Sequence, residues 1–514
     1  MSLKVVRWVF LAVGGLLVVL WIAVALGSRT ETLRRLVTEQ LAERLQSEIE
    51  LAAFSVDTFP TVSIRGEGLV VRLGGRRDVP PLVSIGTFSV EGGLLGLLSR
   101  PRRFGLVNLT GLQINIPPGG IDAKGTSDAP PPAERQESPF VIARLRADDA
   151  ELRIIPRREG KEPRLFRIHR LEMQSLGIAE RMPFQAELTN PVPRGTIHTE
   201  GEFGPWQKHN PGLTPLTGNY TFAKADLSTI KGVGGILEST GEFAGQLEKI
   251  AVKGETRTPD FRVDVSGQPV PLETRFQAVV DGTDGDTYLN DVFATFLDTS
   301  LHAQGAVTGT PGVKGRTVKL RVEIEEGRIE DLLRMAVKSE TPIMIGDVAL
   351  HTDFTLPPGE GDVIERLRLA GKFDVDARFT NRDVQTKLTG MSRRARGEKP
   401  TSGADNIISG LNGRFRLQEG VISFSDLRFA VPGATVSLRG TYGLRSEAIA
   451  FDGTLRMQAT ISEAAGGGVK SIFLKVVDPF FKEGKAGAVL PIKVRGTRKE
   501  PKFGLDVMKA LTPK

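Results

Sequence analysis

Histidine and carboxylate side chains are the residues of this sequence best suited to chemistry, yet their spacing matches no known catalytic or metal site. The chain has 5 histidines and no cysteine, which excludes thiolate chemistry and a disulfide framework. None of the histidines lies in an HExxH pattern or another metal-binding spacing. A GxSxG elbow, a P-loop and a dinucleotide-binding glycine fingerprint are also missing. The histidines are His169, His198, His209, His302 and His351.

One acidic cluster, residues 281–286 (DGTDGD), invites comparison with a calcium-binding loop. An EF-hand loop needs a bidentate glutamate at its twelfth position, where this chain has Val292. A glycine-rich hairpin turn with solvated carboxylates accounts for the cluster better. We therefore expect no catalytic residue, no metal and no cofactor, and we expect that the protein is not an enzyme.

Composition indicates a large chain with many turns. It has 514 residues, including 58 glycines and 31 prolines scattered along its length, which favours frequent turns over long helices. The 26 phenylalanines against 3 tyrosines and 3 tryptophans indicate that aromatic rings act mainly as apolar filler. The net charge of +7 is a mild excess that does not indicate nucleic-acid binding.

Residues 8–27 (WVFLAVGGLLVVLWIAVALG) form an uncharged apolar stretch. At ~1.5 Å per helical residue, this stretch is long enough to cross roughly 30 Å of hydrocarbon. Lys4 and Arg7 precede it, which favours a cytoplasmic N-terminus. Trp8 and Trp21 lie towards its two ends, as interfacial membrane anchors do. We therefore predict a transmembrane signal-anchor, with residues 1–28 forming a cytoplasmic stub and the anchor.

A cleaved secretory signal is the alternative, because residues 23–25 (AVA) resemble a small-residue cleavage site. The apolar core of a cleaved signal usually has roughly 7–15 residues, and this one is longer, so the anchor is the preferred interpretation. Under both interpretations the bulk of the chain is exported.

The residues that follow change from helical to strand periodicity. Residues 29–52 carry an apolar stripe at helical spacing and predict an amphipathic helix. From residue 53 to 116 the period is two, and Leu112, Ile114 and Ile116 alternate with polar residues as in a half-buried strand. Residues 117–139, rich in proline and glycine, predict a flexible linker.

Strand signals dominate residues 140–390, which we interpret as a series of repeats in a β-sheet. The clearest is Leu320, Val322 and Ile324 alternating with charged residues. A loose motif supports the repeats, in which each glycine is interpreted as a turn or bulge and the aromatic residue two positions later as the start of the next apolar face. It occurs at Gly201/Phe203, Gly218/Tyr220, Gly241/Phe243, Gly371/Phe373, Gly413/Phe415 and Gly440/Tyr442.

Two further features interrupt or follow these repeats. Residues 329–337 (IEDLLRMAV) predict a short helix, and residues 391–410 predict a polar linker. In residues 411–514 the strands return, with Val436 and Leu438 on one face, followed by a predicted helix at 469–481.

The region 411–507 resembles the C-terminal region of AsmA-like proteins. The beginning of the chain also fits such proteins, since an anchor and a short helix precede a strand-rich segment that ends with residues 93–116 (GLLGLLSRPRRFGLVNLTGLQINI). The most specific segments are 429–434 (FAVPGA), 438–442 (LRGTY), 477–482 (VDPFFK) and 491–497 (PIKVRGT).

AsmA-like proteins are similar to the bridge-like lipid transfer proteins, in which a long β-sheet curls into a groove with an apolar inner face. The resemblance implies a mostly β fold: an N-terminal transmembrane helix, then an elongated, curled antiparallel β-sheet groove with a few short helices, one near the C-terminus. It also implies a single-pass inner-membrane protein, mostly in the periplasm, that holds phospholipid acyl chains for transport or homeostasis between inner and outer membranes.

The candidate lipid-facing positions under this hypothesis are apolar residues of the clearest strands. The expected partners are membrane lipids, the inner membrane and an outer-membrane or periplasmic protein at the far end. The alternative function is a non-transporting periplasmic scaffold that assists envelope assembly, with its apolar faces closed into an ordinary core. The candidate positions are Leu112, Ile114, Ile116, Leu320, Val322, Ile324, Val436 and Leu438.

Overall fold

The computed structural model describes residues 47–57, 62–73, 80–93, 102–116, 140–154, 164–177, 181–205, 207, 211–282, 285–310, 313, 315–339, 341–398, 407–459, 482–483, 486–497 and 500–505. The expected membrane anchor with Trp8 and Trp21, the expected linker 117–139 and the expected helix 469–481 lie outside these residues. Within the described residues, no helix is both long enough and apolar enough to cross a membrane.

The chain divides into two compact units. Unit 1 comprises Met1–Ile230, Ile236–Arg257 and Gln277–Thr287, and unit 2 comprises Lys231–Gly235, Thr258–Phe276 and Tyr288–Lys514. Both units are built mainly of strands, which confirms the predicted mostly β fold with few short helices.

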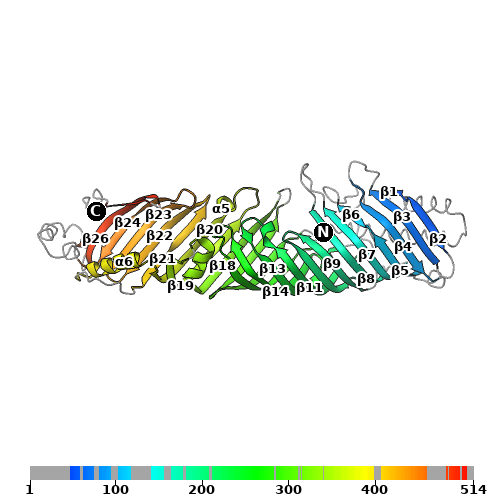
Figure 1. Cartoon of the computed structure of the whole chain (residues 1–514), viewed down its shortest axis with the longest axis horizontal. Helices are drawn as coiled ribbons and strands as arrows, with labels where there is room; N and C mark the ends of the chain where they lie inside the picture. The colour runs from blue at the N-terminus through cyan, green and yellow to red at the C-terminus, as the bar shows by residue number, and fades with distance from the viewer. Residues whose placement is uncertain are drawn as a thin grey trace, which may run out of the picture. The chain divides into compact units, whose positions relative to one another are not determined.

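Unit 1 is a sheet in which most neighbouring strands are antiparallel (Figure 1). Strand β7 is the exception, because it runs parallel to both β5 and β6. Its strands are β1 (Ser47–Glu50), β2 (Ala53–Asp57), β3 (Val62–Leu73), β4 (Val83–Gly92), β5 (Arg102–Thr110), β6 (Gln113–Ile116), β7 (Phe140–Ile154), β8 (Arg164–Leu176), β9 (Met182–Pro191), β10 (Arg194–Phe203), β11 (Pro215–Asp226), β13 (Ile236–Gln246) and the first part of β14 (Lys249–Val263).

In unit 2, strands β17 to β24 pair antiparallel in chain order, and β26 then pairs with β24 and β27. Strand β15 (Val270–Val280) contributes to both units. The other elements of unit 2 are β12 (Val233–Gly234), β16 (Thr287–Phe296), β17 (Thr299–Gly309), β18 (Arg316–Arg328), α4 (Ile329–Ala336), β19 (Met344–Leu356), α5 (Val363–Arg366), β20 (Arg368–Phe379), α6 (Arg382–Ala395), β21 (Ser409–Gln418), β22 (Val421–Val431), β23 (Ala434–Gly443), β24 (Ala448–Met457), β25 (Lys482–Glu483), β26 (Ala486–Thr497) and β27 (Pro501–Leu505).

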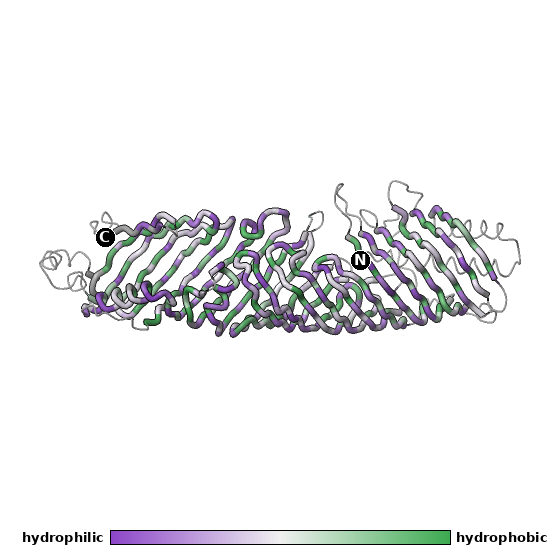
Figure 2. The backbone as a smooth tube through the Cα atoms, viewed as in Figure 1, coloured by the Kyte–Doolittle hydropathy of each residue, from purple (hydrophilic) through white to green (hydrophobic). Residues whose placement is uncertain are grey.

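Alternation of apolar and polar residues determines the faces of both sheets. Figure 2 shows hydrophobic and hydrophilic residues following one another along the strands of each unit. In β18, Val322 lies on one face, whereas Arg321 and Glu323 lie on the other. Side chains of a strand point alternately to its two faces, so this pattern makes one face of each sheet apolar and the other charged.

The apolar face of unit 1 is closed into a dense core in β3 to β7. Val71, Val90 and Val107 are each only 1% exposed, and the ring of Phe88 packs among them at 3%. Such side chains are as well packed as those of an ordinary globular domain.

Helix α4 of unit 2 begins where the sequence predicted a helix, at residue 329.

The structure corrects the predicted bounds of two segments. The predicted linker 391–410 begins inside α6, which runs to Ala395 and starts at the N-cap Asn381, whose side chain accepts hydrogen bonds from the backbone of Asp383 and Val384. The predicted helix 29–52 ends too late, because Ser47–Glu50 form β1 and pair with β3. There, side chains such as Ile49 pack against the core of unit 1, so sheet pairing outweighs helical spacing.

Candidate functional site: the apolar face of unit 2

The candidate site is the apolar face of β18 to β24, where side chains of neighbouring strands form rows. We call this surface the apolar face of unit 2. From the α6 end of the strands towards the α5 end (Figure 1), the rows are Val348, Val375, Leu411, Phe429, Val436 and Leu455; Ile324, Leu350, Phe373, Gly413, Leu427, Leu438 and Gly453; Val322, Thr352, Gly371, Phe415, Phe424, Gly440 and Phe451; and Leu320, Phe354, Leu369, Leu417, Ile422, Tyr442 and Ile449.

The predicted candidate positions of unit 2 all belong to this surface. Leu320, Val322, Val436 and Leu438 are half-buried, whereas Ile324 is only 2% exposed. The face therefore combines a few fully covered side chains with many that keep contact with solvent. A contiguous apolar surface of this kind is uncommon unless it binds something.

Four phenylalanine rings form the centre of the face, and none of them was singled out from the sequence as a binding residue. The ring centroids of Phe373 and Phe415 are 6.1 Å apart, and those of Phe373 and Phe424 are 6.4 Å apart. Phe424 lies 5.8 Å from Phe451. All four rings are half-buried, and they offer a large apolar contact area at low entropic cost.

Glycines on the same face bend the sheet towards it. A Cβ atom on Gly413 would lie 2.5 Å from the carbonyl oxygen of Asp426, and one on Gly453 would overlap the carbonyl oxygen of Ser437. Neighbouring backbones approach each other here more closely than side chains other than glycine allow. The apolar face is consequently the inner side of a curved, groove-like sheet.

These glycines also correct the interpretation of the glycine–aromatic motif. Gly413 and Phe415 lie inside β21 on one face, and Gly413 pairs with Phe373 of β20. In unit 1, Gly241 pairs with Tyr220, and a Cβ on Gly241 would lie 2.7 Å from the tyrosine ring. The motif therefore lies inside strands, with each glycine opposite an aromatic residue of a neighbouring strand, and does not mark turns. The bulge interpretation fits at Gly413 and Phe415, where the register shifts between Arg414 and Phe415.

Helix α4 covers the apolar face at one end of β19 and β20. Ile329, Leu332 and Leu333 pack against a buried cluster that includes Val348 and Val375. Polar contacts also hold the helix in place. Asp331, 5% exposed, accepts hydrogen bonds from the Asp298 backbone nitrogen at 3.0 Å and from Thr299 Oγ1 at 2.8 Å. Burial raises the pKa of the Asp331 carboxyl, and the two hydrogen bonds oppose that shift.

Helix α6 covers the same end of β21 to β24. Leu388 and Met391 pack against the buried Val431 and Ala434. Buried Gln385 donates to the carbonyl oxygen of Ile407 at 2.9 Å, and Ser392 and Thr389 are buried beside it. The apolar residues of α6 recur at helical spacing, at positions 384, 388, 391 and 395, which is the signal that identifies this helix among its many polar residues.

The opposite end of the strands forms a polar margin, which we call the α5 rim. It consists of residues 310, 313 and 315 and of the connections 357–367, 419–420 and 444–447, and Figure 1 places α5 there, away from α6. Arg445 forms ion pairs with Asp362 and with Glu365, the latter at 2.7 Å. The backbone N–H of Ile364 and the Arg445 guanidinium lower the pKa of Asp362. No residue of the short helix α5 is buried.

The candidate positions of unit 1 lie in different surroundings. Leu112 is 5% exposed and belongs to the closed core, and Ile114 packs against that core. Asn115, expected on the solvated side, is also buried and donates to the carbonyl oxygen of Pro81 at 2.8 Å. Ile116 ends β6 beside β7. Leu112 therefore faces a packed interior, and the structure does not group these positions with those of unit 2.

Further along unit 1, the corresponding face carries glycines and hydroxyl groups among half-buried apolar side chains such as Phe184, Ile197 and Phe222. Gly201 pairs with Gly218, and Thr199 pairs with Tyr220. The Tyr220 hydroxyl lies 3.2 Å from Ser239 Oγ, and burial raises the pKa of Tyr220. This stretch therefore mixes apolar side chains with glycines and hydroxyl groups.

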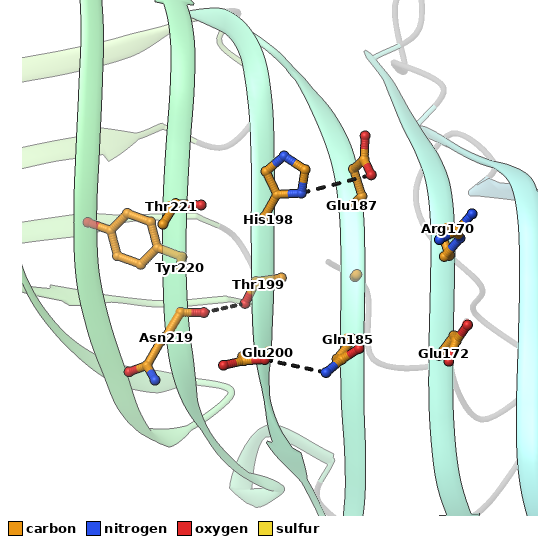
Figure 3. A pocket seen from close by; sticks show the side chains of 11 residues that line it. Arg170, Glu172, Gln185, Glu187, His198, Thr199, Glu200, Asn219, Tyr220 and Thr221 are labelled. Carbon is orange, nitrogen blue, oxygen red and sulfur yellow. Dashed lines mark hydrogen bonds and ion pairs between the residues drawn. The ribbon is translucent and has the colours of Figure 1, made fainter.

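A polar hollow of about 440 Å³ lies on the charged face of β8 to β11 in unit 1 (Figure 3). Gln185 Nε2 donates to Glu200 at 3.4 Å, and His198 Nδ1 lies 3.9 Å from a carboxylate oxygen of Glu187. These side chains are largely exposed and pair across strands. Such pairs stabilise a sheet by modest amounts and provide no activated nucleophile or base.

The other described histidines also have cross-strand partners. His302 Nε2 lies 2.5 Å from Asp291, and its ring stacks on Phe293 at 4.8 Å. His351 lies 3.1 Å from Glu325, and His169 lies 2.8 Å from the Thr189 hydroxyl. Within the described residues, no group of three or more His, Asp or Glu side chains is placed to hold a metal ion.

The described residues of the predicted turn, 281, 282, 285 and 286, belong to unit 1 and are hydrogen-bonded as in a turn. The turn joins β15 to β16, and the Asp281 backbone N–H donates to the carbonyl oxygen of Asp286 at 2.8 Å. The Gly285 N–H donates to the carbonyl oxygen of Asp281 at 2.6 Å.

Comparison with known proteins finds no match to a protein-family model, to a curated protein or to a solved structure.

Proposed function

We propose that this protein binds the acyl chains of membrane lipids on the apolar face of unit 2. Under this proposal it is an AsmA-like protein without catalytic activity, anchored in the inner membrane by residues 8–27, with the bulk of the chain in the periplasm. It carries or conducts phospholipids for transport or homeostasis between the inner and outer membranes. The observation that supports the proposal is the contiguous, half-buried apolar face with its row of phenylalanine rings.

Energetics favour a lipid as the occupant of this face. Roughly 0.8 kcal/mol is gained for each CH₂ group moved out of water, so one acyl chain contributes several kcal/mol. The same contact covers the exposed parts of Phe415, Phe424 and Phe451, whose apolar area otherwise remains in water. A curved face with charged residues on its other side keeps the sheet soluble while it shields the chain.

Photocrosslinking in the full-length protein tests the proposal. Benzoylphenylalanine at Val322 or at Leu438 places the reactive group on the apolar face. The matched controls are Arg321 and Arg439, the adjacent exposed residues on the opposite face. We expect mass spectrometry to find lipid adducts at the first two positions and none at the controls. Equal labelling of all four positions, or no lipid at Val322 and Leu438, would contradict lipid binding.

A non-transporting scaffold for envelope assembly is the second candidate, and the closed core of β3 to β7 favours it for unit 1. The two functions differ in their response to a charge on the apolar face of unit 2. If this face binds lipid, Val322→Asp abolishes the lipid adducts at Leu438 and leaves the chain folded. If the face is an ordinary core, the same substitution unfolds unit 2.

A further inference from the structure

The two ends of the apolar face of unit 2 differ in how well they are covered. At the α6 end, Val348, Val375 and Ala377 are 4%, 3% and 1% exposed beneath α4, and Val431 and Ala434 are 5% and 4% exposed beside α6. At the α5 rim, Leu417 is 4% exposed, but the other side chains of the last row are half-buried, among them Phe354, Leu369, Ile422, Tyr442 and Ile449. The face is therefore closed at one end and open at the other.

The closed end is a fixed wall, because buried polar groups hold both helices in place. For α4 this group is Asp331, which binds the β16–β17 turn, and the partly buried Glu330 accepts a further hydrogen bond from the Gly346 backbone at 3.0 Å. For α6 they are Gln385 and Ser392, and Ser392 donates to the carbonyl oxygen of Pro432 at 2.6 Å. Moving either helix would leave these groups buried without partners, which is unfavourable.

The distance from this wall to the α5 rim matches the length of an acyl chain. At ~3.3 Å per residue, the strand from Leu438 in the second row to Tyr442 in the last row spans about 13 Å, and that from Val348 in the first row to Phe354 in the last row spans about 20 Å. One leaflet of a bilayer provides roughly 15 Å of hydrocarbon depth, half of its ~30 Å core. An acyl chain lying parallel to the strands therefore fits between the helices and the rim.

The chemistry of the two ends gives such a chain a direction. The wall presents Leu332, Leu333 and Met391, which suit a terminal methyl group. The α5 rim presents the hydrated charges of Arg445, Asp362 and Glu365, which suit a headgroup in water. We infer that lipids bind unit 2 with their acyl chains parallel to the strands, methyl ends against α4 and α6 and headgroups at the α5 rim, so that the two helices limit the chain length accepted.

This inference rests on the proposed function, and two photoreactive lipids test it separately. The full-length protein is reconstituted in vesicles of phosphatidylethanolamine and phosphatidylglycerol that contain phosphatidylethanolamine with a diazirine at the acyl terminus or near the acyl carbonyl. We expect the terminal probe to label Phe373, Leu411 or Leu388, and the carbonyl probe to label Phe354 or Tyr442. Labelling of the same residues by both probes, or the reverse order, would overturn the inference and leave the proposed function intact. Failure of both probes to label the apolar face would overturn the proposed function itself.

Substitutions in the wall provide a second, independent measurement. Leu332→Trp places a larger side chain at the closed end and shortens the space for an acyl chain. Leu332→Ala places a smaller side chain there and lengthens that space. In competition between lipids with shorter and longer acyl chains, we expect the first variant to enrich the shorter lipid several-fold and the second to enrich the longer one. Arg334→Trp, on the exposed side of α4, is the matched control and should leave the ratio unchanged. Unchanged ratios in folded Leu332 variants would contradict the proposed role of the helices.

Discussion

Strands β3 to β7 of unit 1 and β18 to β24 of unit 2 share the same sequence pattern but differ in how their apolar faces are covered. Val90 of unit 1 is 1% exposed inside a dense core, whereas Val322 of unit 2 is half-buried on a curved face. The first region follows the packing rules of a globular core. The second leaves apolar area in contact with solvent, and under the proposed function this is the area that binds lipid.

The same valine-to-aspartate substitution, made in each region, should give the largest difference between the two regions. Val90→Asp places an unpaired carboxylate in the closed core, where we expect a loss of roughly 3–5 kcal/mol of stability. Val322→Asp, with solvent within reach, should reduce stability by about 1 kcal/mol. Hydrogen exchange of peptides from each unit measures both effects in the full-length protein. Equal destabilisation would mean that the face of unit 2 is as closed as the core of unit 1.

Removal of aromatic rings gives a smaller difference in the same direction. Phe88 is 3% exposed and lies over Gly66, so Phe88→Ala should cost about 3–5 kcal/mol. Phe424→Ala removes a half-buried ring and its contacts with Phe373 and Phe451, and should cost about 1–2 kcal/mol. Only the second variant should also weaken lipid crosslinking at Leu438. A loss of stability for Phe424→Ala as large as that for Phe88→Ala would contradict the comparison.

The difference in covering is also what the sequence could not predict. Strand periodicity identified β6 and β18 equally well, because alternation reports that one face is apolar without showing what packs on it. Leu112 and Leu320 were therefore interpreted alike, although the first lies in a closed core and the second on a half-buried face. Helix α4 was predicted from its sequence, but its position over Val348 depends on contacts between residues distant in the chain.

The cluster of four phenylalanine rings was missed for a related reason. Phe373, Phe415, Phe424 and Phe451 belong to four strands, and only the strand register brings them together. Phe415 and Phe373 were noticed as members of the glycine motif, but their glycines were interpreted only as turns or bulges. One signal in the sequence was available, since the spacing of two residues puts each glycine and its aromatic on the same face of one strand.

Glycine substitutions test the close approach of strands at the apolar face of unit 2. Gly413→Ala would place a Cβ atom 2.5 Å from the Asp426 carbonyl oxygen, so β21 and β22 must separate, and we expect a loss of about 1–3 kcal/mol. Gly390 lies inside α6, and a Cβ there meets no other atom within 4 Å. Gly390→Ala should therefore stabilise the protein by about 0.5–1 kcal/mol. Opposite signs in thermal unfolding are the expected result, and a neutral Gly413→Ala would contradict the bent sheet.

The smallest effect concerns the buried carboxylate that fastens α4. Asp331 is the only carboxylate among the fully buried residues that the structure describes, and burial raises its pKa. The folded protein therefore binds a proton at this group at a higher pH than the unfolded chain does, so its stability relative to Asp331→Asn should increase as the pH falls from 7 towards about 4. The asparagine keeps an oxygen that accepts from Asp298 and Thr299, which makes it a matched control. Hydrogen exchange in α4 should show this relative gain, and peptides from β3 to β7 should show none. A relative loss in α4 on acidification would mean that the charged carboxylate is favoured there, contrary to its burial.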